Sequence, residues 1–435
     1  MTLVSSFEVQ LQGFTGAFSH RSFRHLVTIL TGWILCRRRT VTQMLIAAGV
    51  VGTIHHSVFH RFFSAATWSL DRLGLIVFGM IEPYLSETCL LSLDDTLAHK
   101  RGRKTFGAGM HHDPLQSGQG QIVTSWGHNW IVLAVIVRFP FWPERVFSLP
   151  ILMRLYVNNK SAAKWKTPYR THNELALEMI HLLCKSYKSR HFHVVADTAY
   201  GRQHVLLKLP ANCDLTSCVR MDAQLHAAPP TEYTCRPGRP RVRGFRLPSP
   251  EQMLQQNKRR LKMKLYGRQQ DLDIAETIAY LYHVPQRPLK IVAVQPLSAG
   301  AKPRTFYSTC QDATAEQVLS WYAQRWSLEV TFHDTKQFLG FEDPPGWTRR
   351  AVERTAPLAM LLYSLIVLWY VQYAAHRKDW SCLPWYRSKQ AASFRDMLTA
   401  LRRQSLEEAF LGVTSDPLPA SNFKKTLQYL VDLAA

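Results

Sequence analysis

The chain has 435 residues, of which 46% are hydrophobic, so it is long enough to bury a large core and to form two or three domains. Charged residues make up 19% and aromatic residues 11%, a composition that excludes a wholly disordered chain. The formal net charge of +22 predicts a polyanionic partner, either nucleic acid or an anionic membrane surface, because composition alone does not separate the two.

Residues 1–85 are predicted to form a helical, basic region that binds DNA. Thr40 and Gln43 make a capping-box pattern at the start of one helix, and two glycines separate that helix from a second one through Phe62. Helix, glycine turn and helix in a basic setting is typical of a helix-turn-helix reader of DNA. A plain helical hairpin with a solvated basic face has the same pattern, so both interpretations stay open.

Residues 86–222 are predicted to form the first part of an α/β core with a mixed sheet. The segments CLLSLDDT, QIVTSWG with NWIVLAVIV, and RVFSLPILMRLYV have the composition of strands. Thr171 and Glu174 make a capping box before an amphipathic helix, and HFHVVADTAYG, YGRQHVLLKL and LTSCVRMD add a strand, a helix and a strand. This order indicates a layered α/β core.

Residues 223–311 are predicted to be a mainly β insertion with a basic front. Residues 236–268 hold eleven Lys or Arg against one acid, Glu251. The runs TIAYLYHV, LKIVAVQPL and RTFYSTC then supply strands. A basic run of this kind is more often a solvated face than a specific reader of bases, but beside a DNA-cutting core it favours contact with phosphates.

Residues 312–350 are predicted to return to the core with one long helix over 312–339. Asp312 or Thr314 is its expected N-cap, and Gly340 is expected to end it.

Four residues of this predicted helix share one face. Tyr322, Arg325, Glu329 and Lys336 lie at offsets of three, seven and fourteen, which places them within roughly 60° of arc on a helix. A stripe this narrow is normally apolar and faces a core. Because it carries a phenol and three charged groups here, we expect a charged ligand along that face.

Acidic residues occupy three places that an α/β core brings together. Asp94 and Asp95 are expected at the end of the first strand, Asp197 at the end of a later strand, and Glu329 on a helix packed beside them. Clustered carboxylates repel one another unless a cation neutralises them, and Mg²⁺ prefers such oxygen ligands. Two Mg²⁺ ions at such a site catalyse phosphoryl displacement, which also gives the positive charge of the chain a purpose.

These residues resemble a known family. The spacing Y-x2-R-x3-E-x6-K in YAQRWSLEVTFHDTK is similar to the YREK signature of bacterial insertion-sequence transposases of the DDE class, and LDDT, VVADTAYG and YAQRW with its acid resemble the family's three acidic blocks in order. The resemblance extends from about Leu91 to Trp347. It implies a ribonuclease-H-like core with a mixed sheet, interrupted by the β insertion and flanked by helical N- and C-terminal regions.

The resemblance also implies roles for individual residues. It makes Asp94, Asp197 and Glu329 ligands of two Mg²⁺ ions, with Mn²⁺ as a substitute, and Asp95 is the alternative to Asp94 as first acid. It makes three residues of the signature DNA contacts near the cleaved end: Tyr322, Arg325 and Lys336. Relatives use a tryptophan of the insertion to hold a flipped base; no Trp occurs between Trp165 and Trp321, so Tyr266 and Phe245 are the candidate replacements.

Further phosphate contacts are predicted on the basic residues of the insertion and on the strand before it. The candidates are Arg220, Arg241, Arg243, Lys258, Arg259 and Arg260.

Residues 351–435 are predicted to be helical, and their apolar run 357–375 to be a helix buried in protein. The run is a single one, is interrupted by polar residues and has basic residues on both sides, which favours a core helix over a membrane span. The eight cysteines form no CxxC pair and the N-terminal segment does not resemble a signal peptide, so we expect reduced thiols in an intracellular protein. The resemblance implies a bacterial protein in the cytoplasm, associated with the nucleoid.

The functional hypothesis is a transposase that binds the inverted-repeat ends of its element, cleaves phosphodiester bonds and joins the 3′-hydroxyl to target DNA. We expect two chains to pair two ends as a homodimer in a synaptic complex, without a membrane partner. The alternatives are a non-catalytic DNA-binding regulator derived from a transposase, and a membrane-surface protein that uses the 357–375 helix.

Overall fold

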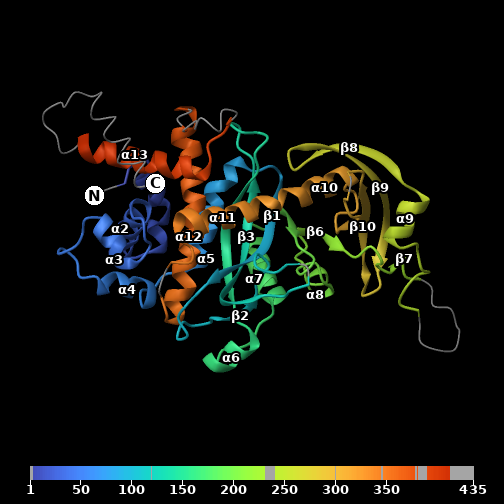
Figure 1. Ribbon diagram of the computed structural model, residues 1–435, viewed down its shortest axis with the longest axis horizontal. Helices are drawn as coiled ribbons and strands as arrows, with labels where there is room; N and C mark the ends of the chain where they lie inside the picture. Colours follow the sequence, from blue (N-terminus) through green and yellow to red (C-terminus); the bar gives the residue numbers. More distant parts are fainter. Residues whose placement is uncertain are drawn as a thin grey trace.

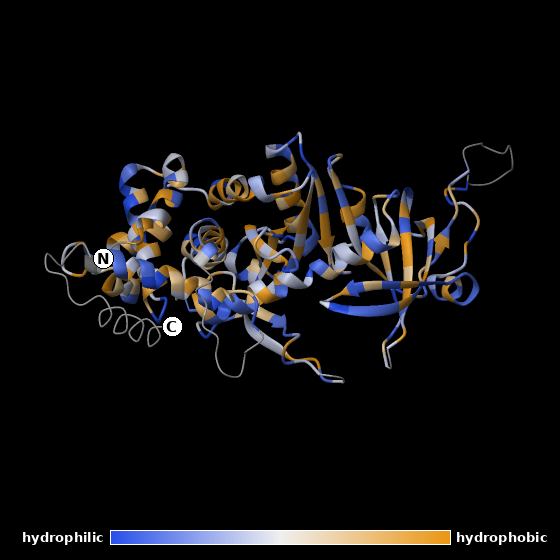
Figure 2. Cartoon of the chain, turned by 90° about the horizontal axis from the view of Figure 1, so that it is seen from above, coloured by the Kyte–Doolittle hydropathy of each residue, from blue (hydrophilic) through white to orange (hydrophobic). Residues whose placement is uncertain are grey.

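A computed structural model of the chain describes residues 3–118, 120–230, 241–298, 300–343, 346–377, 380 and 389–411. Helices of both ends of the chain gather at one end of an elongated molecule, a mixed sheet fills the middle, and the strands of the insertion form the other end (Figure 1). Hydrophobic residues are concentrated on the strands and on the helix faces packed against them (Figure 2).

The N-terminal region is helical, as predicted. The Thr40 Oγ1 accepts a hydrogen bond from the Gln43 N–H at 3.4 Å and caps a helix there, and Phe59, Phe62 and Phe63 are buried on the next helix. The elements are α1 (Ser5–Leu11), η1 (Gln12–Ala17), α2 (His20–Leu35), α3 (Val41–Ala47), α4 (Ser57–Ser64), α5 (Leu70–Ile81) and η2 (Glu82–Tyr84).

The core is a mixed sheet, so the predicted α/β class is confirmed. Strands β3 and β1 are antiparallel, β3 and β4 are antiparallel, and β5 is parallel to both β1 and β6, which is the arrangement of a ribonuclease-H-like core. The capping box of Thr171 and Glu174 is present at the start of α7. The elements are β1 (Thr88–His99), β2 (Gly109–His112), β3 (Thr124–Val137), β4 (Phe147–Tyr156), α6 (Asn159–Trp165), α7 (His172–Ser186), β5 (His191–Ala196), α8 (Gln203–Leu206) and β6 (Cys213–Val219).

The strands of the insertion continue the same sheet. Strand β6 pairs antiparallel with β11, and β10 and β9 follow, so one eleven-stranded sheet runs through both parts. Residues 236–240 of the predicted basic run lie outside the described residues. The elements are β7 (Leu225–His226), α9 (Pro250–Gln256), β8 (Arg259–Leu265), β9 (Arg268–Leu281), β10 (Val284–Pro296) and β11 (Arg304–Ser308).

The prediction of one long helix over 312–339 is wrong in detail. Two helices, α10 (Ala315–Gln324) and α11 (Trp326–Leu339), meet at Arg325, whose N–H bonds to the carbonyl of Tyr322 rather than one residue further back. Thr314 is the N-cap and Gly340, with φ of +58°, ends α11 as predicted.

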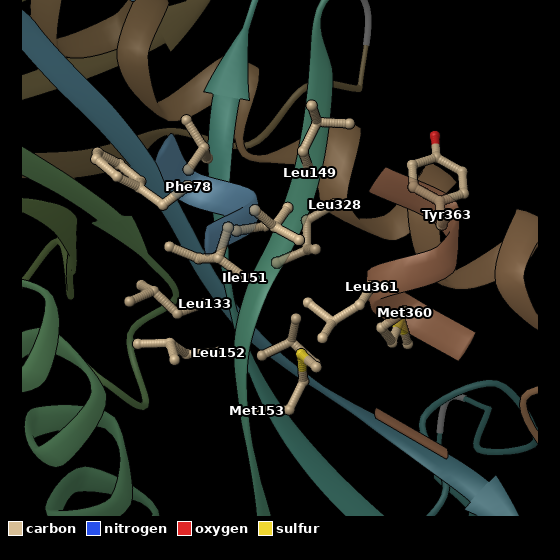
Figure 3. Packing of buried hydrophobic residues seen from close by; sticks show 14 of the residues in the cluster. Phe78, Leu133, Leu149, Ile151, Leu152, Met153, Leu328, Met360, Leu361 and Tyr363 are labelled. Carbon is tan, nitrogen blue, oxygen red and sulfur yellow. The ribbon is translucent and has the colours of Figure 1, made fainter. Parts of the chain in front are cut away.

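The apolar run near the C-terminus forms α12 (Arg349–Trp369). By length and composition its helix is able to cross a membrane, but 94% of its apolar window is buried inside the protein. Buried residues of β4, among them Leu149 and Met153, belong to the same hydrophobic core as Met360 and Leu361 of α12 (Figure 3). The remaining described elements are η3 (Tyr370–Ala374), η4 (Ala375–Arg377) and α13 (Phe394–Leu411); the helix predicted beyond them, in 412–435, lies outside the described residues.

Candidate active site

Strand β1 separates the two neighbouring aspartates. The expectation that they end the strand is wrong. Strand β1 continues to His99, and it is paired with β3 from Leu91 to that residue. Successive side chains of a strand point to opposite faces. Asp94 therefore meets Arg325 of the α10–α11 junction, whereas Asp95 accepts hydrogen bonds from the Tyr200 hydroxyl and the Asn129 amide, both at 2.8 Å.

Asp197 lies beside Asp94 on the neighbouring strand. Leu93 of β1 pairs with Ala196 of β5 in parallel register, and the next residues along the two strands are the two aspartates. The Asp197 carbonyl accepts a hydrogen bond from the Ser217 hydroxyl at 3.0 Å, which anchors the turn after β5. The prediction that an acid follows this strand directly is confirmed.

Glu329 reaches the same place from α11. A chain of hydroxyls holds this helix on the sheet: Ser92 to Ser148 at 2.8 Å and Ser148 to Ser327 at 2.6 Å. The Arg325 guanidinium then bridges two acids, since Nη1 donates to Asp94 and Nη2 lies 3.2 Å from Glu329 Oε1.

Burial and pairing act in opposite directions on this ion pair. Burial raises the pKa of Asp94 to about 7, although the charge of Arg325 beside it favours the ionised carboxylate. Burial also opposes the charged form of Arg325, but Asp94 and Glu329 raise its pKa above the usual value. The guanidinium therefore stays charged and is the cation that these acids hold.

The comparison with known proteins agrees with this geometry. The family model of the DDE superfamily endonucleases matches residues 13–272, which is more than half of the chain and includes Asp94 and Asp197. The chain belongs to the DDE superfamily endonucleases. The match ends before Glu329, so the third acid rests on its position beside Arg325. No curated protein matches the chain.

In this DDE endonuclease the acids suit a metal ion, but a guanidinium holds the position between two of them. Carboxylate oxygens are the ligands that Mg²⁺ prefers, and Asp94 and Glu329 already converge on one cationic group. Within the described ranges, no three Asp, Glu, His or Cys side chains lie close enough together to hold a metal as they stand. The carboxylates are thus of the kind that binds Mg²⁺, but Arg325 must leave its position between Asp94 and Glu329 before these acids can hold one metal ion together.

The rest of the YREK face is turned toward the sheet. Tyr322 is buried, with its ring 4.7 Å from that of Phe306, and Lys336 Nζ donates to the Leu97 carbonyl at 2.6 Å. Protein groups therefore meet this face, where a charged ligand was expected. Contact of Tyr322, Arg325 and Lys336 with DNA stays a prediction.

The basic insertion of this endonuclease is partly neutralised by acids of the next strand. Asp273 of β9, whose side chain is 7% exposed, lies 2.9 Å from Lys258 and 2.8 Å from Arg260, and Arg259 pairs with Glu276 at 3.0 Å. Counting charges along residues 236–268 misses these partners because they follow in sequence and pair across the hairpin. Contact of these three cations with DNA also stays a prediction.

Other predicted contacts differ in how free they are. The Arg220 side chain is 83% exposed but forms two hydrogen bonds to Asp222, at 2.9 and 2.7 Å. Arg243 donates to the Tyr282 carbonyl at 2.8 Å and stacks on its ring, while Arg241 is exposed. Arg220 and Arg243 therefore already use some of their N–H donors within the protein, and contact of all three arginines with phosphate stays a prediction.

The two candidate base-holding aromatics lie far apart. Tyr266 is at the tip of the β8–β9 hairpin in a left-handed conformation with φ of +51°; burial raises its pKa, and the charges of Arg325 and Glu329 act on its phenol. Phe245 is 72% exposed, and its carbonyl accepts a hydrogen bond from the Ala227 N–H, directly after β7. Of the two, only Tyr266 is near the acids.

Sequence reasoning missed a polar cleft next to the acids. A cleft of about 980 Å³ borders Asp94 and Asp197 and is lined by His111, Tyr156 and His172 among others. Burial lowers the pKa of His111 to about 4, so this ring is neutral at pH 7. In the sequence, the two histidines of GMHHDP were the signal of this cleft, but no second group at the spacing of a metal ligand accompanied them.

Proposed function

We propose that this chain is a DNA transposase, which binds the inverted-repeat ends of its element, cleaves them with two divalent metal ions and joins the 3′-hydroxyl to target DNA. The observation that carries the proposal is the convergence of Asp94 and Glu329 on one cation, with Asp197 next in register on the adjacent strand. Membership of the DDE superfamily endonucleases supports a nuclease, and the YREK spacing supports the finer assignment.

The chain's own residues have distinct roles in this proposal. Asp94, Asp197 and Glu329 hold the metal ions, and the hydroxyl chain from Ser92 to Ser327 keeps α11 at a fixed height over β1. When bound, two Mg²⁺ ions, or Mn²⁺ in their place, activate a water or a 3′-hydroxyl and stabilise the leaving oxygen.

DNA is held mainly by charge outside the acidic site. With 53 Lys and Arg against 31 Asp and Glu, the chain attracts phosphates at long range. Tyr322, Arg325 and Lys336 are the proposed contacts near the cleaved end. Two chains pair two ends in a synaptic homodimer, in the bacterial cytoplasm at the nucleoid.

The test is cleavage of a duplex that carries the ends of the DNA segment encoding this chain. Asp197→Ala should abolish nicking at every Mg²⁺ or Mn²⁺ concentration and leave salt-sensitive binding in place, because it removes a metal ligand and few phosphate contacts. Asp222→Ala, an acid paired with exposed Arg220, is the matched control and should cut normally. Cleavage by Asp197→Ala at a near wild-type rate would remove the assignment. Binding without any cleavage by the wild-type protein would instead favour the regulator.

A further inference from the structure

Arg325 holds the position at which the catalytic acids would meet a metal ion. Its Nη1 donates to Asp94 and its Nη2 lies 3.2 Å from Glu329. The side chains of Arg325 and Asp94 are only 13% and 16% exposed, so solvent does not screen them well. A second cation that binds the same oxygens is repelled by the guanidinium unless the guanidinium leaves.

The guanidinium has an unused donor in this position. Its Nε is buried and has no hydrogen-bond partner in the described structure. A buried N–H without a partner is unfavourable, and a planar guanidinium matches the two oxygens of a phosphate in bidentate geometry. A DNA phosphate therefore offers Arg325 a better-matched partner than the two separate carboxylates do.

Arg325 and Glu329 are held in place by separate contacts. Arg325 lies between α10 and α11, where its N–H bonds to the Tyr322 carbonyl at 3.2 Å and its carbonyl accepts from Leu328 N–H at 2.9 Å. Glu329 follows on α11, which is fastened separately to β4, since Thr331 Oγ1 donates to the Ser148 carbonyl at 2.8 Å. The arginine can thus change partners while the acid keeps its place.

We propose that Arg325 is an exchangeable cation that keeps the acids from binding metal until DNA draws it away. This inference rests on the proposed function, because it takes Asp94, Asp197 and Glu329 as the metal ligands. DNA and metal then bind cooperatively: phosphate removes Arg325 from the acids, and the metal ions replace its charge. By linkage, metal must tighten DNA binding by the same factor. The free protein therefore carries little metal until it meets DNA.

The experiment measures bound Mn²⁺ from the electron paramagnetic resonance signal of the free ion, without reference to cleavage. The wild-type protein should bind Mn²⁺ roughly tenfold or more tightly when the end-bearing duplex is present, within the usual range of coupling between two sites. Arg325→Gln should bind Mn²⁺ about tenfold more tightly than wild type without DNA, and DNA should no longer tighten it. Arg349→Gln, an exposed arginine that pairs with Glu353 one helical turn later, as Arg325 does with Glu329, lies outside the site and should behave as wild type.

Two results would overturn the proposal: wild-type Mn²⁺ affinity that is the same with and without DNA, or Arg325→Gln that binds no more tightly than wild type in its absence. The first comparison uses only the wild-type protein, so a variant that fails to fold does not block the test. If neither protein binds Mn²⁺ under any condition, the metal-dependent function itself is wrong. If wild type and Arg325→Gln bind Mn²⁺ equally well without DNA, Arg325 does not exclude metal, but the proposed metal-dependent function still stands.

Discussion

Replacing Asp95 should damage the fold more than the chemistry. Its carboxylate accepts from Tyr200, which is fully buried, and from Asn129, which is 8% exposed. Asp95→Ala leaves both donors without a partner, and each stranded buried donor costs about 1–3 kcal/mol. The sum of roughly 2–6 kcal/mol corresponds to a Tm lower by about 2–7 °C in a chain of 435 residues. Asp94→Asn leaves Arg325 an acceptor and resembles the protonated acid, so near pH 5 its Tm should change little, while cleavage is lost.

The assay combines thermal unfolding, followed by circular dichroism, with single-turnover nicking at a temperature where every variant is folded. Tyr200→Phe removes one stranded hydroxyl, so adding it to Asp95→Ala should raise the Tm, although Tyr200→Phe alone should lower it. This change of sign is the specific signature of the hydrogen bond. The reasoning is refuted if Asp95→Ala keeps the wild-type Tm but is inactive, or if Asp94→Asn cuts normally.

Three further predictions concern charge. Glu329→Gln should stop nicking in a single-turnover protein titration and leave DNA binding intact, because it keeps size but loses the metal-binding charge; normal cutting would contradict this role. Burial raises the pKa of Asp94 to about 7, so at pH 5 the folded protein keeps a proton on this carboxyl that the unfolded chain has already released. Wild-type stability relative to Asp94→Asn should thus fall between pH 5 and 7, by about 2–3 kcal/mol in urea unfolding at most; a pH-independent difference would contradict this shift. Replacing Lys258 and Arg260 with Gln should lower the Tm, because buried Asp273 loses both cations, and Asp273→Asn should restore it; weaker DNA binding at an unchanged Tm would instead show that both cations are free for phosphate.

The parts of the fold that depend on neighbours in sequence were predictable. Capping boxes at Thr171 and Thr314, the strand before Asp197 and the glycine after α11 all depend on residues within one or two turns. The mixed sheet followed from the order of such elements. Of the three acids predicted to lie together, Asp94 and Glu329 contact the same guanidinium and Asp197 is next in register to Asp94, while their role as metal ligands stays a prediction.

The details that were missed depend on residues far away in the chain. Strand β1 continues past Asp95 because β3, some thirty residues later, pairs with it as far as His99. That register decides which face of the sheet each aspartate occupies, and the choice of Asp94 as the first metal ligand stays a prediction. Local periodicity likewise predicted one helix through Arg325, but the hydrogen bonds change at the residue that reaches across to Asp94.

The acidic site poses an electrostatic problem that the net charge hides. DNA must bring a phosphate to three carboxylates, and two unit charges 4 Å apart repel by about 4 kcal/mol at an effective dielectric constant near 20. One guanidinium offsets only part of this repulsion. In the proposed function, the positive surface elsewhere therefore holds the duplex before metal completes the site. We then expect DNA affinity to be sensitive to salt, and cleavage at saturating DNA to depend on metal. A net charge of +22 around an acidic centre suits these two tasks, because the proposed DNA binding uses positive charges and the proposed metal binding uses negative charges at a separate place.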